Sequence, residues 1–138
     1  MNYYASQYRT GDRMDEEEQS KRVRKVLERV KEEYGFVPLV SEVMSGRPDV
    51  YLPYSEMSSN LFFRPKHLDR QTVELAAIAA GTALSSKNCL DVHIIQALRL
   101  GVSEESIMEA MMVGSFMSMN GSNAIAFRCL LAAQGEQR

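Results

Sequence analysis

Three side chains between residues 86 and 93 have the types and the spacing that thiol chemistry requires. Cys89 follows Ser86 by three residues and precedes His93 by four, so all three lie on one face if the segment is a helix. If Ser86 caps that helix, Cys89 lies in its first turn, where unpaired backbone N–H groups and the helix dipole favour a thiolate. A thiolate attacks peroxides and disulfides, and an imidazole one turn away can move the proton that the leaving group needs.

A purely structural role fits the same three residues. Free cysteine is often a small buried hydrophobe, and a serine at the start of a helix often does no more than cap it. A single histidine on an apolar face can be hydrogen-bonded within a core. The local pattern leaves both interpretations open.

Glu74 is a third candidate, because it is the one charged residue in the apolar run TVELAAIAA. A buried carboxylate needs a cationic or hydrogen-bond-donating partner. If its helix pairs antiparallel with the helix of His93, the two residues are offset by roughly 8 Å along the axis. Two long side chains, or one bridging water, could close that gap. A Glu74–His93 pair would make the histidine a better proton relay.

The elements that must position these residues are all expected to be helices. Apolar residues recur at three- and four-residue spacing, and no window shows the period-two alternation of a strand. Expected helix starts include Pro48, Asp69 as a cap and Ser103 as a cap, and Gly101 is expected to end a helix. The expected helices cover residues 16–34, 39–45, 48–63, 70–84, 87–100, 104–119 and 123–133, with an interruption at residues 120–122 (NGS). The sequence therefore predicts an all-α bundle of about six to seven helices.

Length and charge narrow the class of protein. The 138 residues suit one domain, which we expect over residues 16–138 after a mobile polar segment at residues 1–15. Lys plus Arg number 16 and Asp plus Glu 18, so there is no basic excess for nucleic acid. The apolar stretches are too short to cross a membrane, and the N-terminus lacks the apolar core of a signal peptide. Two cysteines make no disulfide framework, so we expect a cytoplasmic protein.

No metal or cofactor site is expected. His67 and His93 are the only histidines, and neither has a second ligand at a typical metal-site spacing apart from Cys89. Cys129, flanked by Phe127 and Leu130, is expected to fill a core. The methionine-rich run IMEAMMVGSFMSM is expected to form a subunit interface, because a helix that is apolar on many sides needs several neighbours.

The segment from about Asp69 to residue 128 resembles the carboxymuconolactone decarboxylase family, and within it the alkylhydroperoxidase D-like branch. That branch carries a glutamate, a cysteine twelve residues later that opens a C-x-x-C motif, and a histidine four residues past the second cysteine. Here those positions hold Glu74, Ser86, Cys89 and His93. The resemblance implies an alkylhydroperoxidase D-like helical domain that assembles into trimers or hexamers and needs no cofactor. It also implies a small-molecule substrate, with Cys89 as nucleophile, His93 as relay and Glu74 as its orienting carboxylate.

Two positions depart from the pattern of the branch. Ser86 replaces the first cysteine, and Asn88 replaces a histidine often found between the two cysteines. Without a thiol at position 86 the local disulfide cannot form. A peroxidase cycle would then use one cysteine, and an external thiol would reduce the sulfenic acid at Cys89. Cys129 could resolve it only if the two Cα atoms come within about 7 Å.

Three functions therefore follow from the sequence. The first is a thiol-dependent oxidoreductase of the peroxidase or disulfide reductase type. The second is a lactone or carboxylate enzyme that resembles the decarboxylases and uses His93 and Glu74, with Arg99 or Arg128 as candidate cations for a substrate carboxylate. The third is a non-catalytic oligomeric binding module.

Overall fold

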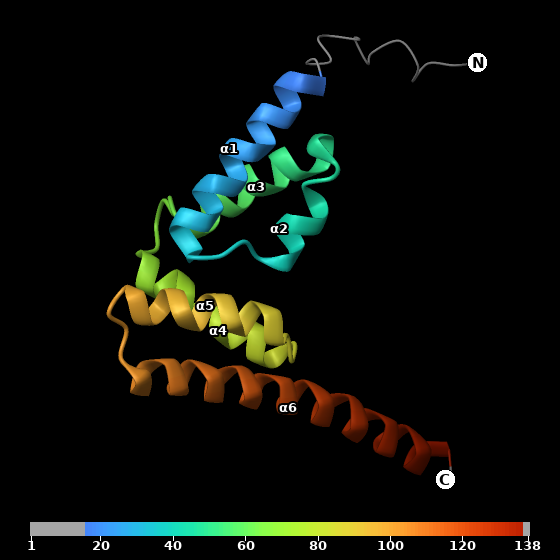
Figure 1. The fold of residues 1–138 in the computed structure, drawn as a ribbon. Coiled ribbons are helices and arrows are strands. Elements are labelled where there is room, and N and C mark those ends of the chain that lie inside the picture. The colour runs from blue at the N-terminus through green and yellow to red at the C-terminus, as the bar shows by residue number, and fades with distance from the viewer. Residues whose placement is uncertain (1–15, 137–138) are drawn as a thin grey trace, which may run out of the picture. The chain divides into compact units, whose positions relative to one another are not determined.

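The chain folds into helices alone in the part that the computed structural model describes, residues 16–136 (Figure 1). The prediction of an all-α fold is confirmed, whereas the predicted mobile segment at residues 1–15 lies outside the described residues. None of the described helices combines the length and hydropathy that a membrane span requires. The six helices are α1 (Glu16–Tyr34), α2 (Leu39–Met44), α3 (Pro48–Phe62), α4 (Arg70–Ala83), α5 (Lys87–Arg99) and α6 (Glu104–Glu136).

The chain divides into two compact units, and the boundary between them falls within α3, after Ser55. In the first unit α1 buries Val23 and Val30, as its apolar spacing predicts. Pro48 opens α3, where its missing N–H costs nothing, and Pro53 lies inside the helix without ending it. Tyr51 is fully buried, and this burial raises the pKa of its hydroxyl.

The second unit is built around α4, which packs against both α5 and α6. Helices α4 and α5 run antiparallel, so that the start of α4 lies beside the end of α5. The Gln71 side chain at the start of α4 donates a 2.8 Å hydrogen bond to the Leu100 carbonyl, just after α5. Apolar residues of α4, α5 and α6 close the core between the helices. Its buried members are Ile78, Ala97, Val102 and Ile107.

Two of the predicted helix ends are confirmed in this unit. The Asp69 carboxylate accepts a 2.8 Å hydrogen bond from the backbone N–H of Thr72, so Asp69 is the cap of α4. Gly101 has a positive φ of 79°, and the next N–H, of Val102, bonds to the Ala97 carbonyl at 3.0 Å. This is the Schellman arrangement, in which the left-handed residue is usually glycine.

The turn between α4 and α5 uses the same arrangement without glycine. Ser85 has a φ of 53°, and the N–H of Ser86 bonds to the Gly81 carbonyl at 2.9 Å. Ser86 is also the residue before the first turn of α5, so one serine closes α4 and starts α5. The turn therefore sets the register between the two helices.

Helix α6 corrects two of the predictions. It runs without interruption from Glu104 to Glu136, so the predicted break at residues 120–122 is wrong. A glycine inside a helix costs about 1 kcal/mol relative to alanine, which is too little to stop a long helix. Ser122 does not compete with the helix either, because its hydroxyl donates to the Ser118 carbonyl one turn back, at 3.1 Å.

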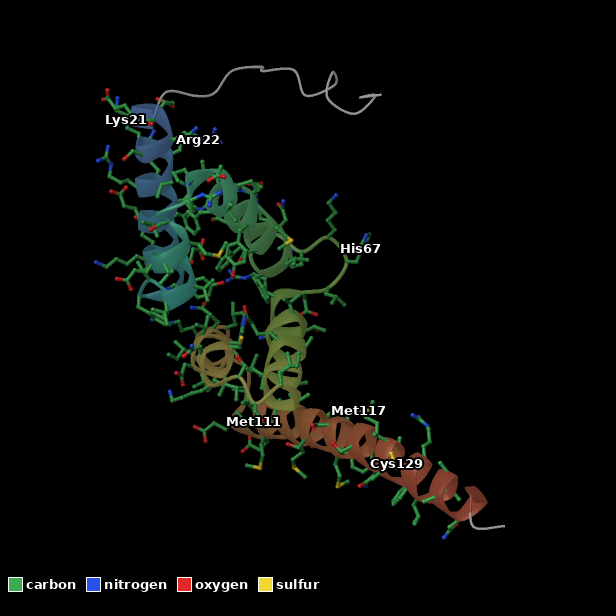
Figure 2. All side chains as sticks on the ribbon, turned by 90° about the vertical axis from the view of Figure 1, so that its right-hand side faces the viewer. Lys21, Arg22, His67, Met111, Met117 and Cys129 are labelled. Atoms are coloured by element: carbon green, nitrogen blue, oxygen red, sulfur yellow. The ribbon has the colours of Figure 1, made fainter. Side chains whose placement is uncertain are left out.

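The second correction concerns Cys129, which is exposed rather than buried in a core. Figure 2 shows it on the outer part of α6, well beyond Met111 and Met117. The residues on either side of it, 125–135, are exposed as well, so this part of the helix has no core to fill. The large apolar residues left exposed along α6 are Met108, Met112, Val113, Phe116, Met117, Met119, Ile125, Phe127, Leu130 and Leu131.

Candidate functional site

The centre of the candidate site is a direct contact between Glu74 of α4 and His93 of α5. Glu74 is fully buried, and its Oε2 lies 2.7 Å from Nδ1 of His93, whose side chain is 12% exposed. When Glu74 is ionised its carboxylate only accepts hydrogen bonds, so Nδ1 of His93 is then the donor. The other ring nitrogen, Nε2, is then the one able to accept a proton from a reacting group.

The offset between Glu74 and His93 is smaller than the roughly 8 Å that the sequence predicts, because Gly81 of α4 lies opposite Cys89 of α5. A methyl group on Gly81 would lie 3.5 Å from Cβ of Cys89, which places these two residues side by side. Counted from there, Glu74 lies about 10 Å along α4 and His93 about 6 Å along α5. The remaining offset is about one helical turn, which a glutamate and a histidine side chain span without a water.

Cys89 is the third residue of α5 and is exposed to solvent. It therefore lies in the first turn, one turn before His93 on the same face, as the spacing predicts. Ser86 is at the N-cap position, but its side chain makes no capping hydrogen bond. The backbone N–H groups at this end of α5 thus keep their positive character close to the sulfur.

Two phenylalanines at the end of α3 and just after it contact His93 and Arg70. The Phe62 ring lies 4.7 Å from the His93 ring, centroid to centroid, with 36° between their planes. The Arg70 guanidinium carbon lies 5.3 Å above the Phe63 ring. Sequence analysis missed Phe62, Phe63 and Arg70, although Arg70 precedes Glu74 by four residues and thus shares its helix face.

The other sequence candidates are not brought to this site. His67 is exposed on the loop between α3 and α4, and Cys129 lies on the outer part of α6 (Figure 2). Arg99 is the last residue of α5 and Arg128 is exposed on α6. Within residues 16–136, no three His, Cys, Asp or Glu side chains come close enough together to hold a metal ion.

Cys89 and Cys129 are both free, and the geometry of α6 keeps them apart within one chain. Helix α6 crosses α4 at Gly114, where an added methyl group would overlap the backbone of Ala79. Cys129 comes fifteen residues later, about 22 Å further along the helix. Cys89 lies close to the crossing, beside Gly81 on α4.

One protein family matches the greater part of the chain. Residues 48–134 match the Carboxymuconolactone decarboxylase family. Searches of curated proteins and of solved structures gave no match. The matched segment is more than half of the chain and contains Glu74, Ser86, Cys89 and His93. The chain therefore belongs to the carboxymuconolactone decarboxylase family.

Proposed function

We propose that the protein is a thiol-dependent oxidoreductase of the alkylhydroperoxidase D-like type, which reduces hydroperoxides with Cys89 as nucleophile. One observation carries the proposal: a buried 2.7 Å contact between Glu74 and His93 lies one helical turn from an accessible cysteine in the first turn of α5. A fully buried carboxylate paired with a histidine has little structural advantage over an apolar pair. It is well suited to orient that histidine and to balance a positive charge on it.

The oxidation step follows from these three side chains. Nε2 of His93 accepts the thiol proton of Cys89, and Glu74 stabilises the resulting imidazolium. The thiolate attacks the terminal oxygen of the hydroperoxide, so that an S–O bond forms and the O–O bond breaks. The alcohol leaves with the proton that His93 returns. The sulfur is thereby oxidised to sulfenic acid and the peroxide is reduced.

An external thiol completes the cycle, because the chain has Ser86 in place of a resolving cysteine. The thiol attacks the sulfenic sulfur of Cys89, releasing water and forming a mixed disulfide. A second thiol then releases an external disulfide and restores the Cys89 thiol. The net reaction consumes one hydroperoxide and two thiols, and gives one alcohol, one disulfide and one water. A reducing compartment such as the cytoplasm supplies such thiols.

The experiment that tests this function is peroxide turnover with a small dithiol as reductant. We expect the parent protein to consume cumene hydroperoxide and Cys89→Ser to lose this activity entirely. Cys129→Ser is the matched control and should retain the parent rate, because Cys129 lies far along α6. Equal turnover by Cys89→Ser and Cys129→Ser would contradict the proposal.

In the decarboxylase-like alternative, Glu74 and His93 transfer a proton on a lactone substrate, and Cys89 takes no part in the reaction. The position of Arg70 favours this alternative, since this cation lies four residues before Glu74 and thus on the same face of α4. Under this alternative Cys89→Ser retains full turnover of a carboxylated lactone while Glu74→Gln loses it. A binding module without catalytic activity would show neither activity.

Self-association of the chain through α6 is part of the same proposal. The helix exposes a row of large apolar side chains of the kind that monomers rarely leave in water. A second copy of the chain offers an equally apolar surface.

A further inference from the structure

Two buried polar atoms of α4 have no hydrogen-bond partner among the described residues. One is Oε1 of Glu74, the carboxylate oxygen that does not contact His93. The other is Nε of Arg70. An unpaired buried acceptor or donor costs about 1–3 kcal/mol, so a partner is strongly favoured at each.

A single small molecule is the simplest partner for both atoms, because α4 carries their side chains on one face. Arg70 and Glu74 are four residues apart on α4, so their side chains are neighbours on one helix face. The stacking of Arg70 on Phe63 at 5.3 Å holds the guanidinium in place. One atom is a donor and the other an acceptor, so a bridging molecule must accept from Nε–H and donate to Oε1. A buried water does both, and such waters bind where buried polar groups lack partners.

A substrate is a poorer bridge than a water. A carboxylate ligand would face the negative Oε1 of Glu74. Cys89, which a hydroperoxide must approach, lies beside Gly81, about 10 Å along α4 from Glu74.

We propose that Arg70 is a positioning residue that holds a buried water against Oε1 of Glu74 and keeps the carboxylate ionised. With Glu74 ionised, Oε2 accepts the hydrogen bond from Nδ1 of His93, and Nε2 is left free as the base toward Cys89. Without the cation and its water, the pair takes up one proton from solvent, so that a neutral Glu74 donates to Nδ1 and the proton of His93 lies on Nε2. The ring would take the opposite tautomer and lose its base. The consequence for catalysis rests on the proposed function, but the tautomer does not.

Long-range ¹H–¹⁵N correlation spectra of the histidine rings test this directly. The chain has only His67 and His93, so exposed His67 serves as the internal reference. At about pH 9, above the ordinary titration range of histidine, the parent should show His93 protonated on Nδ1. At about pH 7, where the variant pair can hold the extra proton, the His93 signals of Arg70→Gln should move toward those of an imidazole protonated on Nε2, while the parent keeps the proton on Nδ1. Arg70→Lys, which keeps a cationic donor, should stay close to the parent.

The matched control is Arg64→Gln, which removes an exposed arginine paired with Glu56 at 2.9 Å in the same unit. Its His93 signals should equal those of the parent. Arg70→Met, which keeps an apolar contact with Phe63, repeats the test if Arg70→Gln does not fold. Unchanged His93 signals in both Arg70→Gln and Arg70→Met would overturn the proposal.

A rate measurement separates this inference from the proposed function. In a Cys129→Ser background, Arg70→Gln should slow the reaction of Cys89 with cumene hydroperoxide about tenfold, a part of what a positioned acid–base group contributes. If Arg70→Gln changes the His93 tautomer but Cys89 of the parent does not react with peroxide, the role of Arg70 is supported and the proposed peroxidase function is rejected. Benzoate could also slow the oxidation of Cys89 by cumene hydroperoxide in the parent but not in Arg70→Gln. That result would show that Arg70 binds a substrate carboxylate, and it would overturn the water-holding role.

Discussion

A single buried carboxylate determines the character of this site at the scale of residues. Glu74 is fully buried, and among the described residues its side chain is hydrogen-bonded to His93. Burying a charge is costly unless it is paired, so each member of the pair constrains the other. The pairing could be anticipated from the sequence, because one charged residue in an apolar run and one histidine on the next helix have few other partners. The roles of Phe62 and Arg70 could not, since they depend on how the end of α3 packs.

The first prediction concerns the stability of this pair. His93→Leu should destabilise the protein by about 3–5 kcal/mol, because it leaves the Glu74 charge buried without a partner. The double variant Glu74→Leu/His93→Leu should recover most of that loss, since an apolar pair of similar volume needs no partner. Urea unfolding followed by circular dichroism measures both. A double variant as unstable as His93→Leu would show that the cost is one of packing, not of charge.

The second prediction concerns the cap of α4. Hydrogen bonds from the backbone and side chain of Thr72 lower the pKa of the Asp69 carboxyl below its ordinary value. A carboxyl whose folded pKa is lowered stabilises the fold above its unfolded pKa, and this contribution is lost as the pH falls through the folded pKa. Asp69→Asn keeps a side-chain cap that does not titrate, so it is the matched reference for the charged carboxylate.

The quantity to measure is the free energy of unfolding of the parent minus that of Asp69→Asn. We expect this difference to be constant from about pH 7 to pH 5 and to fall as the pH drops below about 4, the ordinary range of the aspartate carboxyl. Urea titrations at several pH values give it directly. A difference that does not change with pH would contradict the capping role of the charged carboxylate.

At the scale of helices, the sequence predicted where a helix begins or ends better than whether a long helix is interrupted. Asp69 and Gly101 act through local chemistry, a side-chain cap and a left-handed backbone, which the sequence displays directly. The stretch Asn120–Gly121–Ser122 has residues typical of a turn, yet it continues α6. The turn preference of three residues is weak and is overridden when the residues on both sides favour a helix. The continuity of α6 could therefore not be inferred from residues 120–122 alone.

The third prediction compares two glycines of α6. A methyl group on Gly114 would overlap the backbone of Ala79 on α4, whereas one on Gly121 would meet nothing within 4 Å. Gly114→Ala should therefore destabilise the fold by about 1–3 kcal/mol or more, because the two helices must separate. Gly121→Ala should leave stability unchanged or raise it by up to about 1 kcal/mol, through helix propensity. Thermal unfolding of the two variants provides the comparison, and a Gly114→Ala variant as stable as Gly121→Ala would contradict the close crossing.

At the scale of the whole molecule, the main question is why the outer part of α6, residues 125–135, exposes large apolar side chains. Its large apolar residues are more than half exposed, among them Phe127 at 59% and Leu131 at 66%. The methionine-rich run was expected to form a subunit interface, and this stays a prediction. A second copy of the chain is the partner that we propose, since any apolar surface left in water favours association.

The fourth prediction tests this assembly. Leu131→Asp should shift the protein toward monomers in light scattering coupled to gel filtration, because a charge in an apolar interface carries a large desolvation cost. Gln134→Asp places the same charge on an exposed polar position of the same helix and should leave the parent mass unchanged. A monomeric parent protein at micromolar concentration would count against self-association through α6.

The central claim, that the Glu74–His93 pair activates Cys89, is tested most directly by the rate at which cumene hydroperoxide oxidises Cys89. The rate constant is measured in a Cys129→Ser background by trapping the sulfenic acid with dimedone, for the parent, Glu74→Gln and His93→Gln. The account predicts that both substitutions lower the rate constant by about 10²-fold or more, the usual contribution of a positioned acid–base group. Equal rate constants in all three proteins would contradict it.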